Sequence, residues 1–279
     1  MKKWTLGAMS PLLFIAFLTL MACGDKKSVE TKGGGECSGD TMWFDEREDE
    51  TVGMPAPKKM DEVFSDFLFF FAERPKLQRE RIVFPLPVHR GNQTTYIERS
   101  QWKAERFFFQ QGYSTMLVDC MQQLELSQDT SLNLVVLEKI FLDKKVIQQF
   151  VFSKNEGKWM LEGIEDEPFD TCKNSSFLSF YRQFAADSLF RMQHIKEPLE
   201  YRGPDPEDES RSLKGVMTLE EWEELALPIP SGVIYNADYG QKYTHAKEKI
   251  LVVSGISNSE QIALKFRKEK TWHLVYVEY

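Results

Sequence analysis

The sequence predicts an α+β protein made of two tandem repeats behind an export leader. Three observations carry this prediction. A block of residues recurs 113 positions further along the chain. Each copy opens with phenylalanines at helical spacing, and each copy ends in short apolar runs and alternating residues typical of strands. The hydrophobic content of 42% and the aromatic content of 13% are sufficient to build folded cores.

The first 22 residues are expected to be a signal peptide. Lys2 and Lys3 form a basic start, and an apolar run follows from Leu12 to Met21. This run is shorter than the roughly 20 residues that a membrane-spanning helix needs, but it suits a secretory leader. The run ends at Leu20-Met21-Ala22-Cys23-Gly24, which resembles the bacterial lipobox. The resemblance implies lipid attachment to Cys23, which becomes the new N-terminus after cleavage.

Residues 23–59 are expected to form a lipid-anchored flexible tether. Gly33–Gly35 favours flexibility, and Met54–Pro57 favours an extended chain. The lipoprotein pathway would hold the protein at the cell envelope. Asp25, rather than an acid directly after Cys23, favours an outer membrane over an inner one.

The repeat begins with a block of seven identical residues in each copy. Phe64, Phe67, Phe71, Ala72, Ile82, Pro85 and Leu86 correspond to Phe177, Phe180, Phe184, Ala185, Ile195, Pro198 and Leu199. Trp159 and Trp272 keep the same offset of 113, whereas Trp102 and Trp222 lie 120 apart. The seven extra residues fall near Gly203–Glu209, which the composition predicts to be a loop. The repeat therefore places two α+β domains at 60–166 and 170–279.

Each repeat is expected to run helix, extended segment, second helix and antiparallel strands. The extended segment covers 82–87, where its prolines restrict it to an edge or to the end of a strand. The second helix is expected to carry Trp102 or Trp222, and Thr218-Leu219-Glu220-Glu221 is a capping box for the latter. The remaining strands are expected at 132–141, 146–152, 250–253, 261–266 and 272–279.

This order of elements resembles the nuclear-transport-factor-two-like (NTF2-like) cone. In that fold a curved antiparallel sheet wraps around a long first helix. The lipobox, the Phe64–Phe71 helix, the Ile82–Pro87 segment and their second copies also resemble a family of exported lipoproteins of unknown function. The resemblance to that family implies two tandem cones. It implies no activity.

No catalytic or metal-binding constellation stands out in the sequence. The histidines at 89, 194, 245 and 273 lack the spacing of metal ligands, so neither a metal nor another cofactor is expected. Acids such as Asp119, Asp166, Asp170 and Asp238 could be paired only by the tertiary fold. Phe107–Phe109, Tyr113, Tyr235 and Tyr239 could line a pocket or pack in the core. A formal net charge of −8 argues against nucleic acid as a partner.

The cysteines suggest one disulfide. An exported chain meets oxidising conditions in which thiols pair. Cys37 lies in the expected tether, Cys120 in the first repeat and Cys172 at the junction. We expect Cys120 to pair with Cys172, which would tie the junction to the first repeat and leave Cys37 free.

Three functions remain open on the sequence alone. The first is a non-catalytic module that binds a small ligand or a protein of the cell envelope. The second is an enzyme that uses a cone pocket, with a carboxylate or histidine as the general base. The third is a structural subunit of an envelope complex. The absence of a recognisable catalytic pattern favours the first, with the membrane contacted only through the anchor.

Overall fold

The structure is a computed structural model that describes residues 60–205, 208–241, 247–257 and 260–279. These residues belong to one compact unit. The expected signal peptide, the tether and the lipid-attachment residue Cys23 lie outside the described residues. The fold is mixed α+β, as predicted.

The first half contains two helices, two 3₁₀ segments and six strands. These are α1 (Phe64–Glu73), α2 (Pro75–Glu80), β1 (Leu86–Arg90), β2 (Gln93–Ile97), η1 (Phe107–Gln110), β3 (Tyr113–Val118), η2 (Met121–Gln128), β4 (Leu134–Phe141), β5 (Val146–Asn155) and β6 (Lys158–Pro168). The predicted strands at 132–141 and 146–152 are β4 and β5. The strands expected from the sequence do not include β2, β3 or β6.

The second half repeats this order with small changes. Its elements are η3 (Phe169–Thr171), α3 (Ser175–Ala186), α4 (Ser188–Gln193), β7 (Ile195–Asp205), β8 (Asp208–Met217), α5 (Leu219–Leu225), β9 (Val233–Asp238), β10 (Glu248–Gly255), β11 (Gln261–Lys268) and β12 (Trp272–Glu278). The capping box predicted at Thr218 and Glu221 is present and starts α5.

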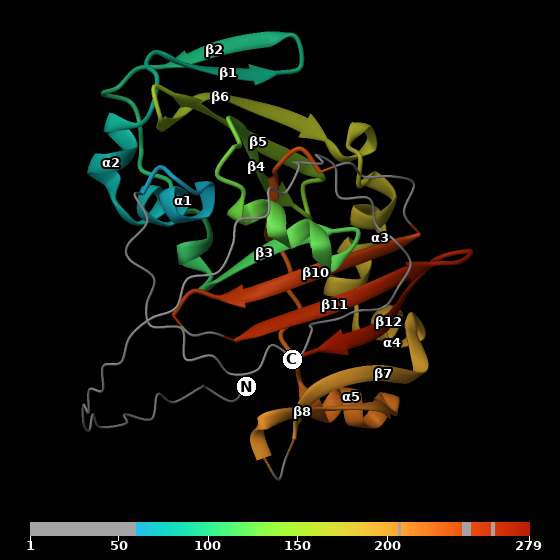
Figure 1. Cartoon of the computed structure of the whole chain (residues 1–279). Coiled ribbons are helices and arrows are strands. Elements are labelled where there is room, and N and C mark those ends of the chain that lie inside the picture. The colour runs from blue at the N-terminus through green and yellow to red at the C-terminus, as the bar shows by residue number, and fades with distance from the viewer. Residues whose placement is uncertain (1–59, 206–207, 242–246, 258–259) are drawn as a thin grey trace, which may run out of the picture. The chain divides into compact units, whose positions relative to one another are not determined.

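The two sheets exchange one strand each. One sheet has the order β2-β1-β6-β5-β4-β9, and the other has the order β3-β10-β11-β12-β7-β8. Strand β9, from the second half, therefore completes the sheet of the first half, and β3 completes the other sheet. In Figure 1 the green strand β3 lies beside the red strand β10. As a result, neither 60–166 nor 170–279 contains every strand of one sheet.

The sheets are mixed rather than antiparallel, which corrects one expectation. Strand β1 pairs in parallel with β6, and β7 pairs in parallel with β12. Parallel neighbours need a long crossover connection. Here the rest of each half supplies it, because β1 and β6, like β7 and β12, are the first and last strands of their halves.

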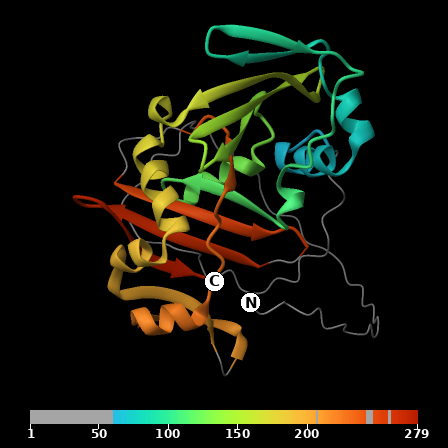
Figure 2. The same cartoon turned by 180° about the vertical axis from the view of Figure 1, so that it is seen from behind.

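The expectation of one long first helix is also corrected, because each half opens with two short consecutive helices. Helix α1 has 10 residues and stops before Pro75, whose ring and missing N–H prevent an α-helix from continuing. Helix α3 has 12 residues and stops at Asp187, whose backbone is extended. The Asp187 carboxylate then accepts a hydrogen bond from the N–H of Phe190 and starts α4. Figure 2 shows α3 and α4 lying across the second sheet.

Two further local expectations are wrong. Trp102 lies in an irregular segment rather than a helix, because Glu98 occupies the place of the capping residue Thr218 and lacks its short hydroxyl. The expected loop at 203–209 lies largely within the β7–β8 hairpin, in which Gly203 pairs with Leu213. Strand pairing overrides the loop-forming composition there.

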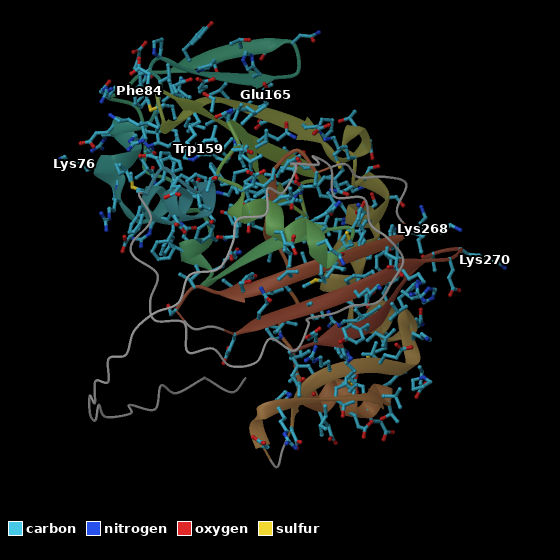
Figure 3. All side chains as sticks on the ribbon, viewed as in Figure 1. Lys76, Phe84, Trp159, Glu165, Lys268 and Lys270 are labelled. Carbon is cyan, nitrogen blue, oxygen red and sulfur yellow. The ribbon has the colours of Figure 1, made fainter. Side chains whose placement is uncertain are left out.

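Two aromatic cores hold the helices on the sheets. Phe64 meets Trp159 edge to face at 5.0 Å, and Phe177 meets Trp272 in the same way at 5.3 Å. Figure 3 shows Trp159 directed inward, whereas Lys268 and Lys270 project from the β11–β12 turn. Edge-to-face rings add about 0.5–1.5 kcal/mol to the stabilisation from burial. The recurring phenylalanines are therefore core residues.

Candidate functional site

A groove with a volume of about 380 Å³ lies where the exchanged strands meet. Its walls come from α1, η1, β3, η2, β4, β9, β10 and the start of β11. The lining residues are Ser65, Leu68, Phe69, Phe108, Ser114, Thr115, Met116, Leu124, Ser127, Leu137, Tyr235, Ala237, Tyr239, Val252, Ser254, Gly255, Ile256 and Gln261. Both β3 and β9 contribute side chains, so the groove depends on the strand exchange.

Side-chain hydrogen bonds hold β3 against β9. The Thr115 hydroxyl donates to the carbonyl oxygen of Tyr235 at 2.6 Å and accepts from the Tyr235 N–H at 2.7 Å. The N–H of Leu117 donates to Oδ1 of the buried Asn236 at 3.0 Å. The strands therefore have a fixed relation although they belong to different sheets. This contact positions Thr115 and Tyr235 in the wall of the groove.

The groove is electrically neutral. Its lining contains no Asp, Glu, Lys, Arg, His or Cys among the residues that the structure describes. Burial raises the pKa values of Tyr235 and Tyr239, so both phenols stay uncharged at physiological pH. Aliphatic and aromatic groups supply most of the wall, and five serine or threonine hydroxyls supply polar points. Such a surface suits an uncharged, mainly apolar molecule.

An exposed aromatic residue borders the groove. Phe69 is 39% exposed, and its ring lies 5.1 Å from that of Phe109. The residue 113 positions later is Arg182, so the second half has no aromatic there. The helix does not need an exposed phenylalanine at this position, since the matching helix α3 forms with arginine. Phe69 is therefore a candidate ligand contact.

Comparison with known proteins gives the family. A model of a domain of unknown function, DUF4348, matches residues 44–279. The chain belongs to this family. It is also similar to an NTF2-like protein from Bacteroides fragilis NCTC 9343, with 36% identity and a TM-score of 0.74. That alignment covers 80% of this chain and 98% of the other. No curated protein matches the sequence.

The comparison shows that this DUF4348 protein has an NTF2-like fold, as the order of elements suggested. It transfers no activity. None of the described helices is long and apolar enough to span a membrane. Within the same residues, no three His, Cys, Asp or Glu side chains are placed to hold a metal ion.

The structure separates the four acids singled out in the sequence. Asp119 is buried against Lys249, and Asp166 binds the exposed Arg90 at 2.9 Å. Asp238 pairs with Lys173 at 3.2 Å, and Asp170 is exposed. None of the four lines the neutral groove. Asp238 instead lines a second, smaller cavity together with Glu138, a carboxyl that no sequence pattern marked as a candidate.

The histidines also lie outside the groove. His89 contacts Thr94, and His194 lies between Phe190 and His273, stacked on both rings. His245 lies outside the described residues. Among the aromatic candidates, Phe108, Tyr235 and Tyr239 line the groove, whereas Phe107 packs against Phe71 and Phe150 in the core.

The predicted disulfide between Cys120 and Cys172 is wrong. Cys172 is a free, buried thiol, while Cys120 is disulfide-bonded. Cys172 precedes α3, where its sulfur packs in the core of the second sheet. Burial raises the pKa of its thiol to about 11, so the group is protonated and unreactive at neutral pH.

Proposed function

We propose that this DUF4348 protein is a non-catalytic binding module whose ligand is uncharged and mainly apolar. The observation that carries the proposal is the neutral groove of about 380 Å³ between the exchanged strands. General acid–base chemistry needs a group that changes protonation near the working pH. The described lining contains none, but it offers apolar contact and several hydroxyl groups.

A neutral fluorescent probe tests this site. N-phenyl-1-naphthylamine is uncharged and apolar, and its fluorescence rises in an apolar environment. We expect saturable binding to the wild type and at least tenfold weaker binding to Phe69→Arg, which introduces the residue found at the matching position of α3. Leu189→Arg is the matched control, because Leu189 is 75% exposed and does not line the groove. Equal loss in both variants, or no saturable binding, would contradict the proposal.

The protein is further proposed to act at the cell envelope, anchored through a lipid on Cys23. The apolar run that ends at this cysteine supports the anchor. The disulfide of Cys120 supports export, since disulfides persist mainly in oxidising compartments. Growth with a labelled fatty acid should tag the wild type but not Cys23→Ser. Labelling of both proteins to the same extent would rule out this anchor.

Tandem duplication is proposed as the origin of the two halves. The two sheets have the same strand order, and each takes its last strand, β9 or β3, from the other half. Matching rings also have matching geometry: Phe71 and Phe152 meet at 88°, and Phe184 and Phe266 meet at 87°. The shared residues are scaffold residues, so the duplication supports a common framework and not two equal catalytic sites.

An enzymatic role is the alternative that one observation favours. Glu138 has a raised pKa, chiefly because of burial, and it lines the smaller cavity. A panel of hydrolase and isomerase substrates would test it. Turnover by the wild type that disappears in Glu138→Gln would replace the binding proposal with the enzymatic one.

A further inference from the structure

The smaller cavity has a volume of about 200 Å³ and occupies the place on the first sheet that the neutral groove occupies on the second. Lys154 pairs with Trp159 as Lys268 pairs with Trp272, which aligns β5 with β11. Following the ladders from there, Glu138 in β4 corresponds to Val252 in β10. Glu138 lines the cavity and Val252 lines the groove.

Other lining residues confirm the correspondence. Gln261 of the groove corresponds to Ile147 of the cavity, and Ser65 corresponds to Leu178. The remaining cavity residues are Gln149, Glu167, Thr171, Cys172, Lys173, Asn174 and Asp238. The fold can therefore be built with an aliphatic residue where Glu138 stands. The carboxylate is a property of this cavity and not a requirement of the scaffold.

The carboxylates of the cavity share few donors. Nε2 of Gln149 donates to Glu138 at 3.3 Å and to Glu167 at 3.0 Å, so one amide serves both groups. Nδ2 of Asn236 donates to Glu138 at 2.8 Å. These partners are neutral amides, which donate hydrogen bonds to the carboxylate oxygens but do not neutralise their negative charge. The like charges of Glu167 and Asp238 add to the effect of burial on Glu138.

The described lining of the cavity contains one lysine beside the three acids Glu138, Glu167 and Asp238. Lys173 reaches Asp238 at 3.2 Å, and its side chain is 66% exposed. The ammonium of Lys249 is bound by Asp119 and by Oδ1 of Asn174, so it serves another ion pair. The cavity therefore combines a partly open space with an excess of carboxylates over ammonium groups in its lining. The absence of a convergent metal-ligand set among the described residues favours an organic cation over a metal ion.

We infer that the cavity bounded by Glu138, Glu167 and Asp238 binds a small organic cation with a primary ammonium or guanidinium head. This site is separate from the neutral groove and does not depend on the function proposed for it. The head group would lie among the three carboxylates, and Ile147 and Leu178 would contact its apolar part. The exposed ammonium of Lys173 would compete with the ligand for Asp238.

The test uses n-butylammonium, with n-butanol as the uncharged molecule of the same size, and follows binding by NMR titration of the full mature protein. We expect saturable shifts for butylammonium and at least tenfold weaker binding of n-butanol. Glu138→Gln and Asp238→Asn should each weaken butylammonium binding at least fivefold. Lys173→Gln should strengthen it several-fold, because it removes the competing ammonium.

Asp166→Asn is the matched control. It removes a carboxylate from the position next to Glu167, on the opposite face of β6, where Asp166 binds Arg90. Butylammonium affinity should stay within twofold of the wild type in this variant. The gain in Lys173→Gln keeps the test decisive if a cavity variant folds poorly. Equal binding of butanol, no saturable binding, or unchanged affinity in Lys173→Gln would overturn the inference.

Discussion

Single polar residues connect segments that are distant in the sequence. Nε2 of the buried Gln78 donates to the carbonyl oxygens of Phe71 and Glu105, while its Oε1 accepts from Nε1 of Trp102 at 3.1 Å. Asp61 similarly binds Arg81 and the N–H of Trp159. Buried polar atoms must be satisfied, so these residues fix the irregular parts of the chain.

Glu138 should make stability depend on pH. Its folded pKa is raised, so the folded state favours the protonated acid. Glu138 makes its largest contribution to stability below its pKa in the unfolded chain, about 4.3. This contribution decreases as the pH rises through its pKa in the folded protein. The free energy of unfolding of the wild type relative to Glu138→Gln should therefore fall between pH 4 and pH 8. Urea denaturation across this range measures the difference, and a constant or opposite trend would contradict it.

Cys172 should resist alkylation in the folded protein. Its thiol is buried, and its pKa of about 11 keeps the thiolate fraction small at pH 7.5. Iodoacetamide should modify the peptide containing Cys172 only after the chain is unfolded in guanidinium chloride, as measured by mass spectrometry. Rapid modification without denaturant would show that the thiol is accessible.

At the scale of elements, β3 and β9 decide how the two halves are joined. Each strand pairs with the sheet of the other half, and the two strands also contact each other through Thr115, Tyr235 and Asn236. A strand is specified by alternation in its own sequence. Its partner is selected by the tertiary structure, because the same alternation would fit either sheet.

Asn236→Ala tests the contact between the exchanged strands. The substitution leaves the N–H of Leu117 and one oxygen of Glu138 without their partner. A buried group without a partner costs about 1–3 kcal/mol, so we expect a loss of about 2–4 kcal/mol in the free energy of unfolding. Asn155→Ala is the control, since Asn155 is exposed and bonds Glu162; its effect should stay within about 0.5 kcal/mol. Equal effects of the two variants would show that the contact is not a stabilising one.

At the scale of the whole molecule, the exchange makes the two halves interdependent. Tyr235, Ala237 and Tyr239 pack in the core of the first half, while Leu117 and Ile140 pack in that of the second. Each half therefore lacks core residues when it is alone. The neutral groove depends on the same arrangement, because both halves supply its walls.

Separate expression of residues 60–166 and 170–279 tests this interdependence. We expect each fragment alone to lack a cooperative thermal transition, because one strand is unpaired and the place of another is empty. Mixing the fragments during refolding should restore one transition and a 1:1 complex, as measured by calorimetry and size-exclusion chromatography. Two fragments that each unfold cooperatively would instead support independent domains.

By itself, the sequence determined the α+β class, the recurring aromatic cores and most strands of the two meanders. These features follow from local periodicity and from residues such as Phe64, Phe177, Trp159 and Trp272, whose size and apolar character require burial. The tertiary structure decided the exchange of β3 and β9, the parallel pairs and the state of Cys172. It also brought Glu138, Glu167 and Asp238 around one cavity. Pairing between distant strands sets these features, and no local pattern encodes which distant segment a strand will meet.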